Sequence, residues 1–329
     1  MNPYPHAAPR YRLVVNGEDI TPTVNGRLIS LAITENSGDE ADTMNLILSD
    51  HDNQLGIPPH GAEIQVAIGW EGEPLIDKGL FTVDETEHSG PPDQLTIRAR
   101  SANLRDDLPG KKSRSWYRVT IGELVQEIAA EHGLKAVVSP RLSGVRLPSP
   151  QQTAESDLNF LTRIGKPYDA LVSVKENRLL FIPKAQATTL SGADLPPVTI
   201  QRRDTDQHRY SHIERDAYTG VRAKWNDIDG GRYEWVVAGS PEKATELPET
   251  FATEHDAMTA ATAEWARLER GKATLNLTLA RGEAALQVET PLRLQGWKDD
   301  IDAKWWIVLR VDHRLMESGF NSSVESETK

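Results

Sequence analysis

The sequence predicts an α+β fold that is mostly β, with two tube-like β-barrel domains joined by a helix–helix–hairpin domain. Two observations carry this prediction. Segments that alternate between apolar and polar residues, separated by turn residues, fill both ends of the chain. Between them lie two segments with helical apolar spacing and recognisable caps. We expect an N-terminal barrel in residues 1–103, a central α+β domain in 104–200 and a second barrel in 201–329.

The first barrel is predicted from six alternating segments. In one of them, Ile64, Val66 and Ile68 share one face of a strand, because successive side chains point to opposite sides. The pair Asn16-Gly17 is a strong turn signal after the first segment. The predicted strands are Tyr11–Val15, Arg27–Thr34, Asp42–Leu48, Glu63–Trp70, Gly79–Val83 and Gln94–Arg100.

The central domain begins with a helix whose two ends are both marked. Thr120 and Glu123 form a capping box, and Gly133 supplies the left-handed residue that follows the last turn. An arm rich in proline, serine and glycine crosses over at 139–150. A second helix starts near Ser156 and stops at Gly165.

A hairpin follows the second helix, with strands at Ala170–Val174 and Leu179–Ile182 around a polar turn. The second β region is then predicted from Ala217–Trp225, Tyr233–Ala238, Lys272–Leu279, Pro291–Leu294, Trp305–Arg314 and Phe320–Val324. A third helix near 254–270 interrupts it, with Thr253 as its cap. We expect it to pack on its own barrel through a stripe formed by Met258, Ala261, Trp265 and Leu268.

The two β regions share a faint sequence echo. Gly69-Trp70 is followed by Val83-Asp84, and Gly296-Trp297 is followed at nearly the same spacing by Val311-Asp312. A histidine trails each Val-Asp pair, His88 in the first region and His313 in the second. The alternation of the preceding strands is out of phase by one residue. The echo therefore permits two similar barrels without requiring them.

Composition excludes several classes of protein. The chain of 329 residues carries a net charge of −12, which argues against a surface built to bind nucleic acid. No apolar run approaches the roughly 20 residues that a membrane span needs, and Met1–Arg10 does not read as a signal peptide. The chain has no cysteine, which excludes disulfides and thiolate chemistry and fits folding in a reducing cytoplasm.

The chemical motifs are weak, so we predict no catalytic residue, no metal and no cofactor. Asp50-His51-Asp52-Asn53 resembles the start of a calcium loop but lacks its closing glutamate, so a turn with Asx hydrogen bonds is favoured. His208 and His212 are four residues apart, as zinc ligands on a helix would be, but their context indicates a strand or loop. Glu35 and the acidic run 39–42 are the best candidates for a carboxylate pair, and an exposed loop is favoured there too.

Some aromatic residues are candidates for interface anchors. Trp305 and Trp306 are adjacent, so in a strand one of them must point away from the core that holds the other. Trp116 and Tyr117 pose the same question at the start of the central domain. Covering by neighbouring elements of the same chain and contact with a partner are both open for these pairs. Pro58 and Pro59, in a tip loop, are further candidates.

The second helix and the residues before it carry the most specific motif. Its members are Gln152, Glu155, Ser156, Asp157, Phe160, Leu161 and Arg163. This run resembles the Q-x-x-E-S-D-x-x-F-L-x-R-L signature of the phage late-control gene D family. Members of that family are baseplate hub proteins of contractile tails and R-type pyocins, related to the hub part of type VI secretion spike proteins. The first β region also resembles the opening barrel of this family.

The resemblance implies a non-enzymatic hub, a homotrimeric symmetry adapter between a hexameric tail tube and a trimeric central spike. The implied partners are further copies of the chain, the spike protein and the tail tube protein, with tape-measure and other baseplate proteins as further candidates. It implies no membrane and no specific nucleic acid binding, and a place in a phage or pyocin baseplate assembled in the bacterial cytoplasm. Two other functions stay open at this point, a tail-associated cell-wall hydrolase and a carbohydrate-binding tail module.

Overall fold

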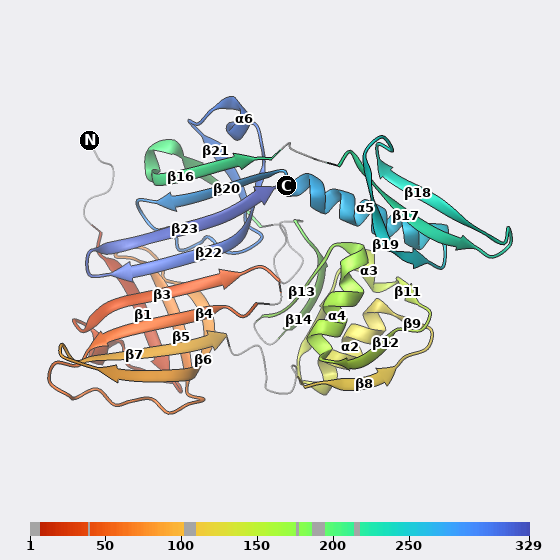
Figure 1. The fold of residues 1–329 in the computed structure, drawn as a ribbon. Helices are drawn as coiled ribbons and strands as arrows, with labels where there is room; N and C mark the ends of the chain where they lie inside the picture. Colours follow the sequence, from red (N-terminus) through yellow and green to blue (C-terminus); the bar gives the residue numbers. More distant parts are fainter. Residues whose placement is uncertain (1–6, 39, 102–109, 176–177, 186–194, 214–217) are drawn as a thin grey trace.

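The computed structural model describes residues 7–38, 40–101, 110–175, 178–185, 195–213 and 218–329. It has three parts (Figure 1). A large sheet contains strands from both ends of the chain, a compact α/β domain lies beside it, and a small outer sheet packs on a long helix. Among the described residues, no helix has the length and apolar character needed to span a bilayer.

All six strands predicted for the first region are present. The N-terminal β half consists of β1 (Pro9–Val15), β2 (Glu18–Asp19), α1 (Thr21–Val24), β3 (Leu28–Asn36), β4 (Thr43–Ser49), β5 (Glu63–Trp70), β6 (Ile76–Ser89) and β7 (Gln94–Ser101). Its strands are ordered β3-β4-β7-β6-β5-β1-β2. Ile64, Val66 and Ile68 are all buried, as their alternation predicts.

The C-terminal β half contains strands that the sequence only partly indicated. It consists of β15 (Val198–Gln201), η2 (Arg202–Asp204), β16 (Thr205–His212), β20 (Ala273–Leu279), β21 (Pro291–Gln295), α6 (Asp299–Asp302), β22 (Trp306–Met316) and β23 (Gly319–Thr328). Its strands are ordered β16-β20-β23-β22, and β21 joins β22 to β15.

The prediction of two separate closed barrels is not met. β22 pairs with β3, so both halves belong to one sheet of 13 strands, and the described strand order does not close on itself. The physical reason lies in the length of β22. Its first residues pair with β21, while Arg310–Met316 extend past β21 and pair with β3. Figure 1 shows β16, β20, β23, β22, β3, β4, β7 and β6 following one another across the sheet.

The central domain confirms the two predicted helices and the hairpin. It contains β8 (Lys112–Ser115), β9 (Val119–Thr120), α2 (Ile121–Glu131), β10 (Lys135–Val138), α3 (Pro140–Ser143), β11 (Arg146–Leu147), β12 (Gln151–Glu155), α4 (Asp157–Gly165), η1 (Lys166–Tyr168), β13 (Ala170–Lys175) and β14 (Arg178–Pro183). The Thr120–Glu123 capping box is formed on both sides, and Ser156 caps α4 through the amide of Asn159. Asn177, expected at the hairpin turn, lies outside the described residues.

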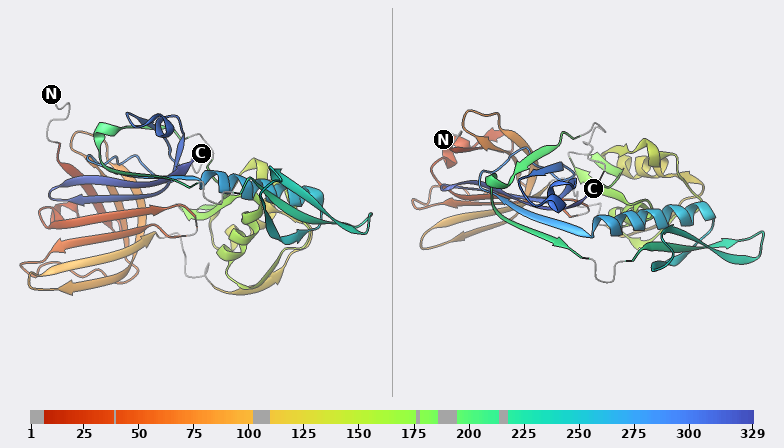
Figure 2. Two further views of the ribbon diagram at one scale, coloured as in Figure 1. Left: turned by 45° about the horizontal axis from the view of Figure 1, so that its top comes forward. Right: turned by 90° about the horizontal axis from the view of Figure 1, so that it is seen from above.

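The outer sheet was predicted as part of the second barrel, and this is wrong. β17 (Gly220–Asp227), β18 (Arg232–Gly239) and β19 (Ala244–Phe251) form a separate sheet of order β18-β17-β19. The helix α5 (Glu254–Arg270), capped by Thr253 as predicted, packs on this sheet. The two further views show α5 lying along it (Figure 2).

The predicted apolar stripe of α5 is partly wrong. Ala261 is buried, and Trp265 and Leu268 pack against the core of the outer sheet, but Met258 is 40% exposed. Ala257 is fully buried in its place. Alanines at 257 and 261 let the helix approach the sheet closely, which turns Met258 toward solvent.

Arg270 contacts all three parts of the fold. Arg270, at the end of α5, binds the carboxylate of Asp169 in the central domain at 2.6 Å. It also binds Glu327 in β23 of the large sheet at 3.0 Å. Arg270 is only 8% exposed, so these are buried ion pairs that join three parts of the fold.

Candidate functional site

The segment from Asp50 to Asn53 forms the predicted turn with Asx hydrogen bonds rather than the start of a calcium loop. Asp50 is 2% exposed, and its carboxylate accepts hydrogen bonds from the amide of Leu55 at 3.0 Å and from His88 at 3.2 Å. The carboxylate of Asp52 accepts hydrogen bonds from both terminal nitrogens of Arg27, Nη1 and Nη2, and from the amide of Gln54. The Arg27 hydrogen bonds lower the pKa of Asp52 to about 2. The carboxylates are therefore held by protein donors, which fits a structural turn.

Two of the acidic residues considered as a catalytic pair are held by lysines, whereas Glu40 is exposed as expected. Glu35 lies 2.8 Å from the buried Lys78, and Asp42 lies 3.1 Å from Lys175. Both carboxylates are mostly buried, not exposed in a loop as expected. Asp39 lies outside the described residues. These pairs join strands and domains, and each carboxylate is mostly enclosed by protein.

His208 and His212 lie in the strand β16, so they share one face of the sheet. His208 packs edge-on against Trp297, and His212 stacks on Tyr210. The expectation of a strand or loop is confirmed here. Neither histidine belongs to the one cluster of potential metal ligands found among the described residues.

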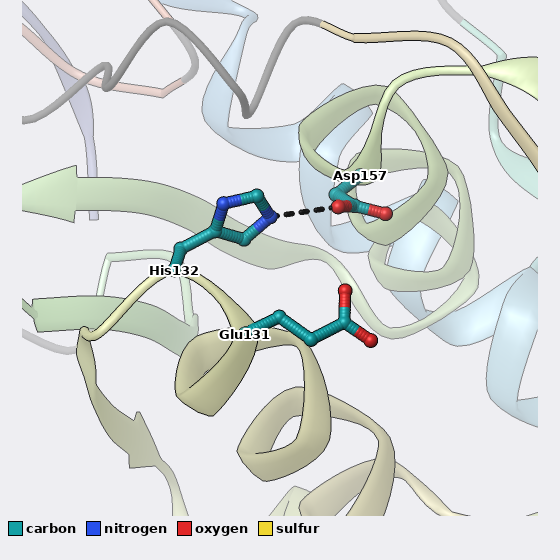
Figure 3. Close-up of side chains that lie close together, drawn as sticks. All are labelled: Glu131, His132 and Asp157. Atoms are coloured by element: carbon teal, nitrogen blue, oxygen red, sulfur yellow. Dashed lines mark hydrogen bonds and ion pairs between the residues drawn. The ribbon is translucent and has the colours of Figure 1, made fainter.

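That cluster lies at the signature motif, and the structure explains the motif through it. We call it the Asp157 cluster, and its members are Lys112, Arg114, Glu131, His132, Gln152 and Asp157. β8 supplies the two cations, the end of α2 supplies Glu131 and His132, β12 supplies Gln152, and α4 starts with Asp157. Figure 3 shows His132 and Glu131 facing Asp157 across the gap between the two helices.

Asp157 is fully buried and accepts hydrogen bonds on both of its carboxylate oxygens. Oδ2 accepts from Lys112 at 2.6 Å and lies 2.8 Å from Nε2 of His132. Oδ1 accepts from Arg114 at 2.7 Å and from Gln152 at 2.9 Å. Burial alone would raise the pKa of Asp157, but these donors lower it to about 2, so the group is ionised.

The cluster offers three potential metal ligands, in Glu131, His132 and Asp157, whose ligating atoms lie within 4.8 Å of one another. A cation there would have to displace both Lys112 and Arg114, which already neutralise the two carboxylates. The carboxylates of Glu131 and Asp157 therefore have cationic hydrogen-bond donors without a metal. Its chemistry is that of a buried, charge-balanced clamp that fixes α2, α4, β8 and β12.

The remaining signature residues are structural as well. Gln152 also donates to the carbonyl of Glu155, and Arg163 pairs with the carboxylate of Glu155. Phe160 and Leu161 are fully buried in the core of the domain. The sequence analysis missed Lys112, Arg114, Glu131 and His132. The available signal was the spacing of Lys112 and Arg114, which are two residues apart and would share one face of a strand.

Each predicted aromatic pair places one residue inward and one outward. Trp306 is fully buried, whereas Trp305 is 38% exposed beneath the guanidinium of Arg293, 3.7 Å from the ring centroid. Trp116 stacks on Phe160 and donates to Glu127, so neighbouring elements hold it.

Tyr117, next to it, is 73% exposed. Pro58 is half-buried and Pro59 is exposed. Tyr117, Trp305 and Pro59 therefore keep surface that a partner could contact, whereas Trp306 does not.

Comparison with known proteins identifies the family. A family model described as phage tail baseplate hub (GPD) matches residues 42–319. The probable baseplate hub protein of Escherichia phage P2 is 38% identical over an alignment 361 residues long, and the match covers 98% of this chain and 93% of that protein.

Two solved structures share the fold. One is a tail protein from Neisseria meningitidis MC58, with a TM-score of 0.70 and 13% identity, covering 97% of this chain and 96% of that one. The other is a type VI secretion component of E. coli, with a TM-score of 0.60 and 10% identity, covering 92% of this chain and 74% of that one. Taken with the family match, the chain belongs to the phage tail baseplate hub (GPD) family.

Proposed function

We propose that this structural baseplate hub works as a homotrimeric symmetry adapter, which joins a hexameric tail tube to a trimeric central spike. Its role as a baseplate hub rests on the family. The trimer and its two partners are our proposal. One structural observation carries it, namely that the two β halves of the chain repeat the same strand order.

The N-terminal half is ordered β3-β4-β7-β6-β5-β1, and the C-terminal half is ordered β16-β20-β23-β22-β21-β15. When the strands of each half are numbered in chain order, with β2 left out, the two halves have the same strand order. One pairing differs in direction, since β1 is antiparallel to β5 whereas β15 is parallel to β21. The outer sheet and α5 are inserted between β16 and β20, where the first half has only the turn between β3 and β4.

The repeat extends to the register of individual residues. Equivalent residues of β4 and β20 are 231 sequence positions apart. Ile47 of β4 pairs with Thr96 of β7, and its equivalent Thr278 of β20 pairs with Ser323 of β23. Buried apolar side chains occupy the same places in both strands. They are Met44, Leu46 and Leu48 in β4 and Leu275, Leu277 and Leu279 in β20.

The sequence echo lies on equivalent strands but not at equivalent positions. Gly69-Trp70 ends β5 and Gly296-Trp297 follows β21, one residue out of register. The structural equivalent of Val83 is Val308, not Val311. Val83 and Val308 each come directly before the point where the strand pairing shifts register. His88 and His313 are equivalent. The repeat is therefore real in the fold, although the dipeptides located it only approximately.

Two equivalent modules in one chain make a trimer geometrically suited to two symmetries. Three copies would present six modules around the axis, which matches a sixfold tube, while the chain as a whole keeps threefold symmetry for a spike. The type VI secretion neighbour is described as structurally similar to the phage T4 tail proteins gp27 and gp5. This likeness concerns the fold alone and is consistent with the proposal.

The proposed work of the hub is mechanical. Permanent interfaces of this kind bury roughly 2,000 Å² or more, so extended β surfaces rather than one residue would carry it. The buried clusters around Lys78 and Asp157 are charge-balanced ion pairs, which agrees with a non-enzymatic role. We also propose that the hub assembles in the bacterial cytoplasm, which the lack of cysteine fits.

Native mass spectrometry of the full chain tests this proposal. We expect a trimer at micromolar concentration, either alone or once the spike protein is added, and a complex of trimer with tail tube protein. A chain that stays monomeric and binds neither protein would contradict the proposal. A stable dimer would contradict it as well, because two copies would present four modules.

A further inference from the structure

We propose that neighbouring copies in the trimer join through two strand edges, the outer part of β6 in one copy and β16 in the next. The pairing would be antiparallel and would repeat the internal β3–β22 junction residue for residue. This inference rests on the proposed trimer and adds to it a named interface with a register.

Several strand edges of the large sheet lack a partner within the described chain, and two of them are those of β16 and of the outer part of β6. β16 is the last strand of the sheet and pairs only with β20. In β6, the residues from Glu85 to Ser89 pair with β7 on one side, whereas the pairing with β5 on the other side ends at Thr82. Open edges expose backbone donors and acceptors that readily pair with another strand.

The internal junction shows what a partner at these edges would look like. β22 begins beside β21 and continues beside β3. β6 begins beside β5 in the same way and continues with none of the described strands in the place that β3 occupies. The repeat makes β6 the equivalent of β22 and β16 the equivalent of β3. A β16 strand from a second copy would therefore complete β6 as β3 completes β22.

Irregularities in the ladders fix the register of this proposed junction. Equivalent strands interrupt their pairing at equivalent places, namely Leu28/Ser30 in β3, Thr205/Gln207 in β16, Val83/Glu85 in β6 and Val308/Arg310 in β22. Ser30 is thus equivalent to Gln207, and Arg310 to Glu85. Transferring the internal pairs Thr34↔Asp312 and Ile33↔His313 then gives Ser211↔Glu87 and Tyr210↔His88.

The transferred pairs are chemically consistent. Across the internal junction, the hydroxyl of Thr34 donates to the carboxylate of Asp312. At the proposed junction, Ser211 would bring a hydroxyl to the carboxylate of Glu87, which is exposed in the single chain. His88 already points toward the core side, where it contacts Asp50. It would meet Tyr210, which faces the core of the other half.

The edge of β6 is acidic. It carries the exposed Asp84, Glu85 and Glu87, which pair with arginines of β7 in the same chain. β16 carries one exposed acid and one exposed base, Asp206 and Arg209. Two copies of the β6 edge would oppose like charges, whereas β16 opposite β6 would not.

The two edges differ from each other, so the contact is head-to-tail. Such contacts generate either a closed ring or an open filament, depending on the rotation between copies. If the ring closes after three copies, the β3–β22 junctions within each chain would alternate with the β16–β6 junctions between chains. Because β16 is equivalent to β3 and β6 to β22, all six junctions would join equivalent strands, which matches a sixfold tube.

Cysteine cross-linking tests the interface directly, because the chain has no cysteine of its own. The test variant combines Glu87→Cys with Ser211→Cys in the full chain, with and without spike protein. Directly opposed residues in antiparallel strands place their Cβ atoms about 4.5–5.5 Å apart, close enough for mild oxidation or a short bis-maleimide to join them. The matched control combines Ser211→Cys with Arg12→Cys, an exposed position on β1.

We expect the double variant to lose its monomer band on a non-reducing gel and to give a covalent trimer. Each single variant should stay monomeric on the gel, and an equal mixture of the two should give dimers only, because the contact is head-to-tail. A native trimer whose double variant cross-links no more than the control would overturn the interface and leave the proposed function standing. A chain that is monomeric in native mass spectrometry would overturn both.

Discussion

The hydroxyl of Thr34 donates a hydrogen bond to the carboxylate of Asp312, which lies 278 positions away in the chain. This contact joins β3 to β22 and thereby makes one sheet from the two ends of the sequence. The same junction contains the buried pair of Lys78 and Glu35 and the buried His313. The two β halves are therefore joined by backbone pairing and by polar side chains, and not only by apolar packing.

Replacing Thr34 should weaken this junction. Thr34→Val removes the donor and leaves the carboxylate of Asp312 without it, so we expect a loss of about 1 kcal/mol in the free energy of unfolding. Urea denaturation would measure it. Thr43→Val, at an exposed position of β4, is the matched control and should change stability by less than about 0.5 kcal/mol. Equal effects of both substitutions would show that the hydrogen bond contributes nothing.

The Asp157 cluster should be needed for the stability of the central domain. Asp157→Asn removes the buried charge that Lys112 and Arg114 neutralise, and we expect a loss of roughly 2–3 kcal/mol near pH 7. The pKa of Asp157 is lowered to about 2, so its contribution is complete above about pH 4 and is lost as the pH falls through 2.

Hydrogen exchange of the amides in α2 and α4, at pH 7 and at pH 3, would measure this effect. The control is Asp19→Asn, which breaks the exposed pair with Arg12 and should have little effect. Unchanged protection in the Asp157→Asn variant at pH 7 would contradict the structural role of the cluster.

Glu289 should destabilise the fold at alkaline pH. Burial raises its pKa to about 7, so the folded protein holds this proton more tightly than the unfolded chain does. Stability from this group is therefore present below about pH 4.5 and is lost as the pH rises through 7. Glu289→Gln imitates the protonated form at every pH. We expect it to raise the free energy of unfolding by roughly 2–3 kcal/mol at pH 8 and by much less at pH 5. A gain of the same size at both pH values, measured by urea denaturation, would count against this cause.

Trp70 should hold the loop that precedes β21 against the N-terminal half. Its indole N–H donates to the carbonyl of Gly282 at 2.8 Å, and its ring packs on Phe320. Trp70→Phe keeps an aromatic ring but leaves that buried carbonyl without its donor, so we expect a loss of about 1–3 kcal/mol. Trp235→Phe, at a position 42% exposed, is the control. If both substitutions lower the midpoint temperature of thermal unfolding equally, the Gly282 contact has no specific role.

Local signals in the sequence were sufficient for the helices and most strands. The capping box at Thr120 and the cap at Thr253 place the starts of α2 and α5 correctly, because cap chemistry acts within one turn. Met258 was placed on the wrong face, since helical spacing alone cannot tell a bulky exposed residue from small buried alanines that allow close packing. The merging of two β regions could not be predicted, because strand partners 278 positions apart leave no local signal.

The signature motif predicted the family but not the reason for its residues. Asp157 and Gln152 are conspicuous in the sequence only as part of a pattern, and their partners Lys112 and Arg114 lie in a stretch for which the sequence predicted no helix or strand. Their role depends on β8 pairing with β12, which only the fold reveals. Which of the anchor candidates Trp305 and Trp306 is exposed also depends on the fold, because Trp306 at the start of β22 points into the core and Trp305 just before it does not.

Electron cryo-microscopy of the assembled full-length hub tests the central claim most directly. We predict a threefold particle whose large sheets form a ring of six similar β modules, two from each chain, spaced about 60° apart around the axis. A particle of other symmetry, or a trimer in which the two halves of each chain lie at unrelated angles and radii, would contradict it.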